Sequence, residues 1–154
     1  MSSNFLFLYL SDYKLFRRTF QLGEQSGFNE HFRNGSNNFT YFVPTNQAWE
    51  RVSAADRVES LSAPQLRNVL ESHLVSGARL GLHQLRARER LTVQGGPSLV
   101  VRTQEDRLYL LTTDGRKAKI IQADIECRDG VIHLIDTVIM QVGKHQTNDG
   151  LRWV

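Results

Sequence analysis

The chain has 154 residues, 40% of them hydrophobic and 23% charged, and its formal net charge is +3. This length supports one domain with its own core and excludes two full-sized domains, while the composition excludes a disordered chain. Cys127 is the only cysteine, which excludes an internal disulfide. The apolar run from Phe5 to Leu10 lacks the leader and cleavage site of a signal peptide and is far shorter than a membrane span of roughly 20 residues. If the parent protein is secreted, we expect its signal and anchor to lie outside this chain.

Taken in chain order, the first predicted elements are a helix and a strand. Apolar residues recur at helical spacing between Tyr13 and Leu22, and Gly23 is the expected C-terminal stop. Residues 39–43 are rich in aromatic and β-branched side chains, which predicts a strand that ends at Pro44.

Two further helices are predicted from their N-terminal capping residues. Thr45 or Asn46 can accept a backbone N–H group at the start of a short helix. Ser62-Ala63-Pro64-Gln65 supplies a capping box with an early proline. Apolar residues and His73 then follow on one helical face, and Gly77 is expected to close the helix.

Beyond Gly77 the hydrophobic period changes from that of a helix to that of a strand. The pairs Asp114-Gly115 and Asp129-Gly130 predict tight hairpin turns. Short, closely spaced strands favour antiparallel pairing over parallel βαβ units, so helices followed by strands predict an α+β fold. The predicted strands cover residues 91–93, 99–101, 108–111, 119–121, 123–125 and 131–135.

Two neighbouring triplets match the acceptor pattern for N-linked sugar, Asn34-Gly35-Ser36 and Asn38-Phe39-Thr40. One such match arises by chance in many intracellular proteins. Two of them beside a predicted surface turn favour a secreted glycoprotein. We therefore predict glycosylation at Asn34 and Asn38, with crowding between the two sugars limiting their simultaneous occupancy.

The sequence carries no recognisable catalytic or metal-binding pattern. It has no Gly-x-Ser-x-Gly elbow, no His-Glu-x-x-His, no glycine-rich phosphate loop and no cysteine pair. Cys127 is expected to be an inert, half-buried thiol, and His73 and His133 to be neutral core histidines. We therefore predict no catalytic residues, no cofactor and no metal.

The segment from Arg79 to Lys119 holds nine Arg or Lys residues against four acids. Arg86, Arg88 and Arg90 share parity and would share one face of a strand. This pattern predicts, as an alternative function, binding of an acidic, heparin-like glycan, whereas a solvated β-surface with scattered arginines is the competing interpretation. Nucleic acid is not expected, because it conflicts with a secreted location. The predicted glycan-binding residues are Arg86, Arg88, Arg90, Arg116, Lys117 and Lys119.

Three blocks of the sequence, in this order, resemble the fasciclin family of cell-adhesion domains. Residues 39–49 resemble its first block, Thr-x-Phe-Ala-Pro-Thr-Asn-x-Ala-Phe, with two apolar replacements. Residues 70–77 resemble its central Tyr-His-x-x-x-Gly segment, with Ser72 in place of the tyrosine. Residues 129–139 resemble its second block, Asn-Gly-x-Ile-His-x-Ile-Asp-x-Val-Leu, with Asp129 in place of the asparagine.

The resemblance extends over residues 5–142 and implies a fold for them. The implied fold is a compact α+β domain, a wedge of two small, mainly antiparallel β-sheets flanked by several short α-helices. Residues 143–154 are then a C-terminal tail or a linker to a neighbouring domain. The resemblance also implies an extracellular location, in a secreted or membrane-anchored adhesion or matrix protein that repeats such domains. Any membrane attachment would run through an anchor outside this chain.

Some fasciclin domains bind integrins through a segment just before the second block that carries Asp-Ile. This chain has Asp124 and Ile125 at that place, while Ala123 and Glu126 depart from the family pattern. An exposed Asp124 carboxylate could coordinate an integrin's metal ion. The alternative is that Asp124 is a turn acid and Ile125 a core aliphatic.

The residues and the resemblance together predict a non-enzymatic, extracellular cell-adhesion module of a larger protein. Its predicted partner is an integrin-type cell-surface receptor, another copy of itself, or the extracellular matrix with its acidic glycans. An intracellular enzyme with an unrecognised site is the remaining alternative.

Overall fold

The computed structural model describes residues 10–33, 38–52, 57–112, 115–127 and 129–140. Within these residues the strands form one seven-stranded sheet in the order β2-β1-β7-β6-β5-β4-β3. The strands are β1 (Phe39–Pro44), β2 (Leu74–Ser76), β3 (Arg90–Leu91), β4 (Leu99–Gln104), β5 (Arg107–Leu111), β6 (Lys117–Glu126) and β7 (Gly130–Ile135). The helices are α1 (Leu10–Ser26), α2 (Glu30–Arg33), α3 (Asn46–Glu50), the 3₁₀ turn η3 (Val58–Ser60), α4 (Ala63–Glu71) and α5 (Leu82–Arg86).

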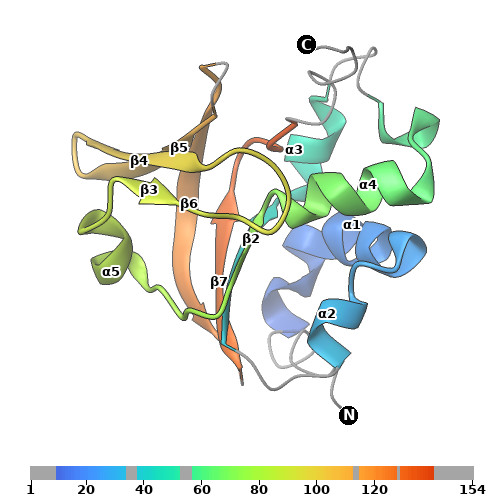
Figure 1. The fold of residues 1–154 in the computed structure, drawn as a ribbon, viewed down its shortest axis with the longest axis horizontal. Coiled ribbons are helices and arrows are strands. Elements are labelled where there is room, and N and C mark those ends of the chain that lie inside the picture. Colours follow the sequence, from blue (N-terminus) through green and yellow to red (C-terminus); the bar gives the residue numbers. More distant parts are fainter. Residues whose placement is uncertain (1–9, 34–37, 53–56, 113–114, 128, 141–154) are drawn as a thin grey trace.

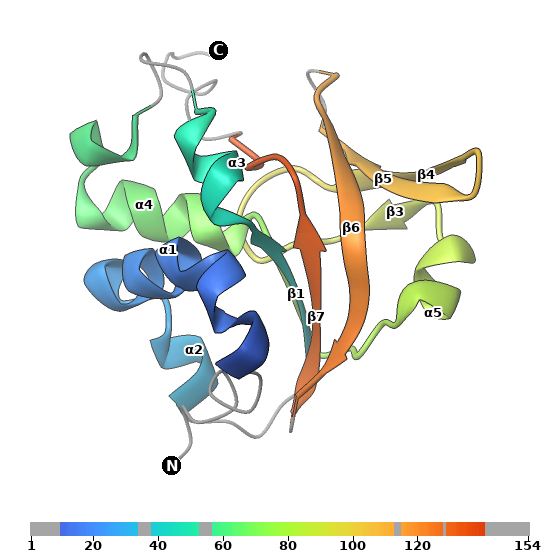
Figure 2. The same cartoon turned by 180° about the vertical axis from the view of Figure 1, so that it is seen from behind.

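The predicted α+β class is confirmed, but the division into two small sheets differs from the structure. β6 continues through both halves, because residues 117–119 pair with β5 and residues 120–126 pair with β7. The strands predicted at 119–121 and 123–125 are therefore one strand with register shifts. Pairing is antiparallel except between β1 and β7, which run parallel. The result is a single curled, nearly barrel-shaped sheet with helices α1 to α4 on one side (Figures 1 and 2).

Helix α1 continues past the glycine predicted to stop it. The Asn29 side chain occupies the space that a Cβ atom at Gly23 would need, and its amide donates to the Phe20 carbonyl oxygen at 3.2 Å. Gly23 therefore serves close packing within the helix. The helix ends at Ser26, and the next residue, Gly27, adopts a φ of 83° that favours glycine.

The strand-to-helix corner at Pro44 forms as predicted. The Thr45 side chain caps α3 by accepting the Ala48 N–H group. Thr19 of α1 ties the corner down: its hydroxyl donates to the Pro44 carbonyl oxygen at 2.8 Å and accepts the Trp49 indole N–H at 2.7 Å. One buried hydroxyl thus joins α1, β1 and α3.

Helix α4 begins at the predicted capping box between Ser62 and Gln65, but it ends before Gly77. Its last residue is Glu71, and residues 74–76 form the edge strand β2. His73 therefore lies in the turn between helix and strand, and not on the helix itself. Helix α5 differs from the prediction as well, because the periodicity beyond Gly77 predicts only strands.

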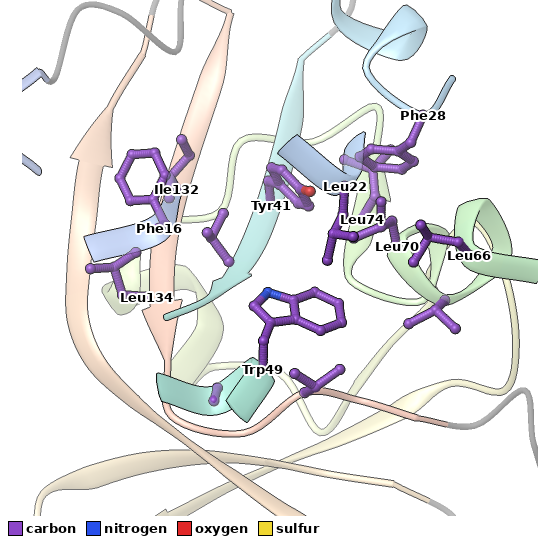
Figure 3. Close-up of a cluster of buried hydrophobic side chains, with 14 of the residues drawn as sticks. Phe16, Leu22, Phe28, Tyr41, Trp49, Leu66, Leu70, Leu74, Ile132 and Leu134 are labelled. Carbon is purple, nitrogen blue, oxygen red and sulfur yellow. The ribbon is translucent and has the colours of Figure 1, made fainter. Parts of the chain in front are cut away.

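Two clusters of buried side chains lie on opposite faces of the sheet. The first lies between the sheet and α1 to α4, where Tyr41 and Trp49 are surrounded by Phe28, Leu22 and Leu70 (Figure 3). The second lies inside the curl of the sheet and beneath α5, and it includes Phe42, Leu85, Leu99, Leu110 and Ile135. Among the described residues, no helix has the length and apolarity to cross a membrane.

Candidate functional site

His133, in the middle of β7, joins three segments of the chain. Its Nδ1 atom accepts the Asp124 N–H group at 3.1 Å, so the ring proton resides on Nε2, which donates to the Leu80 carbonyl oxygen at 2.7 Å. The ring also stacks on Phe42, with centroids 5.6 Å apart. Burial lowers the pKa of His133, so the imidazole is neutral. The predicted role as a satisfied core histidine fits this geometry.

His73 is fully buried and makes the corresponding pair of bonds with the opposite tautomer. Its Nδ1–H group donates to the Val69 carbonyl oxygen at 2.9 Å, and its Nε2 atom accepts the Ile139 N–H group at 3.0 Å. Burial lowers the pKa of His73 to about 4. Because backbone groups occupy both nitrogens of each ring, neither His73 nor His133 has a nitrogen available for proton transfer to a substrate.

Asp124 lies on the surface, at the last register shift of β6. It adopts a φ of 61°, and its Oδ1 atom accepts the Leu82 N–H group at 2.8 Å. This carboxylate therefore caps the N-terminus of α5 from a distant strand. Gly81 precedes the helix, and a Cβ atom there would lie 2.9 Å from Asp124 Oδ1. No local sequence signal predicts this cap, because the helix and the capping side chain are about 40 residues apart.

The structure separates the two residues of the predicted receptor-binding pair. Asp124 is exposed, whereas Ile125 is only 5% exposed and belongs to the cluster between sheet and helices. A receptor could therefore reach the Asp124 carboxylate but not the Ile125 side chain. Within the described chain, no group of three or more His, Cys, Asp or Glu side chains could hold a metal ion.

Cys127 and Ser72 are both buried, and their surroundings account for them without a catalytic role. Burial raises the pKa of the Cys127 thiol to about 12, so the thiolate nucleophile does not form near neutral pH. Ser72, which replaces the family's tyrosine, is fully buried and donates its hydroxyl to the Gly95 carbonyl oxygen. Ser72 thereby fastens the end of α4 to the loop before β4.

The two predicted sugar acceptors are only partly within the described residues. Asn34 lies outside them. Asn38 is exposed, with its backbone carbonyl oxygen bound by the Gly77 N–H group at 2.8 Å, so a sugar on its side chain would face solvent. The Thr40 hydroxyl of this triplet is buried and bonded to Ala78 and Leu80. Glycosylation at Asn38 stays a prediction.

The predicted glycan-binding arginines do not share one strand. Arg86 is the last residue of α5, Arg88 lies beyond it, and Arg90 begins β3. Their shared odd–even position in the sequence therefore does not place the three side chains on one face. Arg116 precedes β6, while Lys117 and Lys119 lie on β6.

Sheet register brings a different set of basic residues together. Arg102 of β4 lies opposite Tyr109 of β5, which lies opposite Lys119 of β6. The alternation of polar and apolar residues along β4 and β5 marks their outward faces, but the pairing between strands cannot be deduced from alternation alone.

A cavity of about 600 Å³ lies where α1, α3 and η3 meet. Its lining includes three arginines and two glutamates, and Arg18 and Arg57 both pair with Glu59, at 3.8 and 3.6 Å. Trp49 forms part of its wall and is only 6% exposed. The cavity therefore combines a small apolar floor with a rim of internal ion pairs.

These features define an α+β domain whose central polar side chains, His73 and His133, are hydrogen-bonded within the scaffold. The chain belongs to the fasciclin domain family, whose model matches residues 14–141. It is 30% identical to fasciclin-1 of Schistocerca americana over 145 residues, covering 84% of this chain and 21% of that protein. It is 27% identical to human periostin over 118 residues, covering 71% of this chain and 13% of periostin.

A solved structure has the same fold, a FAS1 domain pair from the insect cell adhesion molecule fasciclin I. The TM-score is 0.71 at 23% identity, with 83% of this chain and 48% of that chain covered. The described chain thus corresponds to one domain of such a pair. It spans about a fifth of the length of the insect fasciclin-1.

Proposed function

We propose that this chain is an extracellular adhesion module of a larger protein, and that it acts by binding a cell-surface receptor, the matrix or another copy of itself. The family match over residues 14–141 carries this proposal, because its relatives include fasciclin-1, and fasciclin I is a cell adhesion molecule. Coverage of only about a fifth of that relative supports a larger parent protein.

The geometry supports binding by exposed side chains over catalysis. His73, His133 and Cys127, the three side chains considered for catalysis from the sequence, are all buried in the core. Asp124 is the exposed acid next to the family's second block. Its Oδ1 atom holds α5, which leaves its second carboxylate oxygen for a receptor's metal ion.

Attachment of cells and of domain-coated beads to the immobilised domain tests this proposal. Cell attachment that a divalent-metal chelator abolishes would support an integrin-type receptor. Bead clustering that ignores the chelator would support self-recognition. A folded domain that supports neither would contradict the adhesion proposal for this module.

The informative variant for the receptor is Asp124→Asn. An asparagine amide oxygen can still accept the Leu82 N–H group, and asparagine tolerates a positive φ, so α5 keeps its cap while the charge is lost. Loss of chelator-sensitive attachment in this variant would assign the contact to the Asp124 charge. Unchanged attachment would remove Asp124 from the receptor site. Asp124→Ala is the weaker choice, because it also removes the cap.

Glycosylation tests the extracellular location separately. Expression in a glycosylating host should add sugar mass that the Asn38→Gln variant loses at least in part, with Asn34→Gln reporting the other acceptor. An unmodified wild-type mass would weaken the secretory proposal. An acidic glycan is the second candidate partner, and the basic residues that sheet register brings together favour it.

A further inference from the structure

The outer surface of β3 to β6 gathers five basic side chains. In an antiparallel sheet, directly opposed residues lie on the same face. The rows are Arg90–Val100–Leu111–Lys117, Arg102–Tyr109–Lys119 and Gln104–Arg107. We call this surface the basic sheet face, and define it by Arg90, Arg102, Arg107, Lys117, Lys119 and the central Tyr109.

The reverse face of the same strands fixes the direction of these side chains. Leu99 and Val101 alternate with Arg102 on β4, and both belong to the buried cluster inside the curl of the sheet. Leu108 and Leu110 do the same on β5. The basic side chains therefore face solvent, and Arg102 and Arg107 are both exposed. β4 and β5 project away from helices α1 to α4 (Figure 1).

The charge of this face is not compensated within the described chain. Elsewhere, arginines pair with acids: Arg67 lies 3.3 Å from Glu71, and Arg79 lies 2.8 Å from Glu126. Among the described residues, none of the five basic side chains of the face makes such an ion pair. Acids flank the face in sequence without pairing with it, namely Glu89, Glu105 and Asp106, and Asp136 binds the Lys119 backbone N–H group.

The spacing suits an extended polyanion better than a single anion. Neighbouring strands lie about 5 Å apart and alternate residues about 7 Å apart, so the basic groups form a grid with spacings on that scale. Tyr109 lies at its centre, with the Lys117 ammonium 4.8 Å from the ring centroid. The sulfate or carboxylate groups of such a polymer can accept charge-assisted hydrogen bonds from these cations.

We propose that the basic sheet face binds a sulfated or uronate-containing polysaccharide. A protein partner is disfavoured, because lysine is depleted in protein interfaces, and Lys117 and Lys119 both lie beside Tyr109 at the centre of this face. The choice of a glycan over other polyanions rests on the proposed extracellular setting. Binding is measured with purified components, so it can succeed or fail independently of cell attachment.

The test is salt elution from immobilised heparin. Wild-type domain should elute above physiological salt of about 0.15 M, because several cations act together on a polyanion. The variant Arg102→Ala/Arg107→Ala/Lys117→Ala should bind free heparin roughly tenfold more weakly or worse. The matched control, Lys14→Ala/Arg17→Ala/Arg67→Ala, removes the same charge from α1 and α4, on the helical side of the sheet, and should elute near wild type.

Equal weakening of the two triple variants would overturn the proposal, since net charge alone would then explain retention. Wild-type elution at or below physiological salt would overturn it as well. Equal affinity for single-stranded DNA or for vesicles with acidic lipid would overturn the glycan assignment. If the triple variant fails to fold, Arg107→Glu at the β4–β5 turn tests the same surface, and unchanged heparin affinity there would count against it.

Discussion

The inner half of the sheet, with β1 and β7, and the outer half, with β4 and β5, differ in how far their side chains are buried. In β1 and β7 every residue is buried, because helices cover one face and the curl of the sheet covers the other. In β4 and β5 buried residues alternate with partly or fully exposed ones. Side chains of the first pair are thus fixed by packing, while the outward side chains of the second pair are free to serve a partner. The first pair carries the scaffold, and the second carries the basic sheet face.

The largest effect is expected from Phe42→Ala in β1. Phe42 is 0% exposed and stacks on His133, so its loss should leave a cavity and lower the free energy of unfolding by about 3–5 kcal/mol. The matched change in the outer half, Tyr109→Ala, should cost less than about 1 kcal/mol. Urea denaturation of both variants measures the difference. Equal losses would show that the outer half is as constrained as the inner one.

The next effect is a pH dependence centred on His73. The pKa of His73 is about 4 in the folded chain against an ordinary value of 6.5, so between these values the unfolded chain binds more protons. The contribution of His73 to the free energy of unfolding is therefore fully present above about pH 6.5. It falls by about 3 kcal/mol as the pH drops to 4. The lowered pKa of His133 acts in the same direction.

Urea denaturation at several pH values between 7 and 4, for wild type and His73→Gln, isolates this contribution. Carboxylates titrate in both proteins, so their effect cancels in the difference between the two curves. The variant should be less stable at pH 7 and show the shallower decline. Parallel curves would mean that His73 has the same pKa in the folded and unfolded chains, in conflict with its burial and its bond from the Ile139 N–H group.

The elements with local signals were predictable from the sequence. The Thr45 cap and the Ser62–Gln65 capping box each involve residues three apart, and both form as predicted. Helix α5 had no such signal, because its capping side chain, Asp124, belongs to another strand. The prediction that Gly23 ends the first helix was wrong for a similar reason. The absence of a side chain at Gly23 makes room for Asn29 and does not mark the end of the helix.

The candidate surfaces show the same limit. The basic character of residues 79–119 was visible in the sequence, but the assumption that Arg86, Arg88 and Arg90 share a strand was wrong. The basic sheet face depends on the register between β4, β5 and β6. This register is set by pairing between strands and not by the local sequence. The split between exposed Asp124 and buried Ile125, in contrast, matches the alternative interpretation of the sequence, a turn acid followed by a core aliphatic.

A smaller effect is expected where β6 meets α5. Asp124→Ala removes the cap of α5 and places alanine at a positive φ, which together should cost about 1–2 kcal/mol. Asp124→Asn should cost less than about 0.5 kcal/mol, because both features survive. Urea denaturation compares the two variants. A loss for Asn as large as that for Ala would mean that the charge itself, and not the cap, stabilises this junction.

The smallest effect is expected on the basic sheet face. Arg102→Ala/Arg107→Ala removes two unpaired cations from a repelling set, so the free energy of unfolding should stay within about 0.5 kcal/mol of wild type. Any gain should appear at low salt and vanish at high salt, where the repulsion is screened. Arg79→Ala is the contrasting control, because Arg79 also donates to the Cys127 and Gly130 carbonyl oxygens, at 3.2 and 3.0 Å. It should cost about 1 kcal/mol at either salt concentration. A clear loss for the double variant would show that these arginines hold the sheet together, and the outer face would then be scaffold as well.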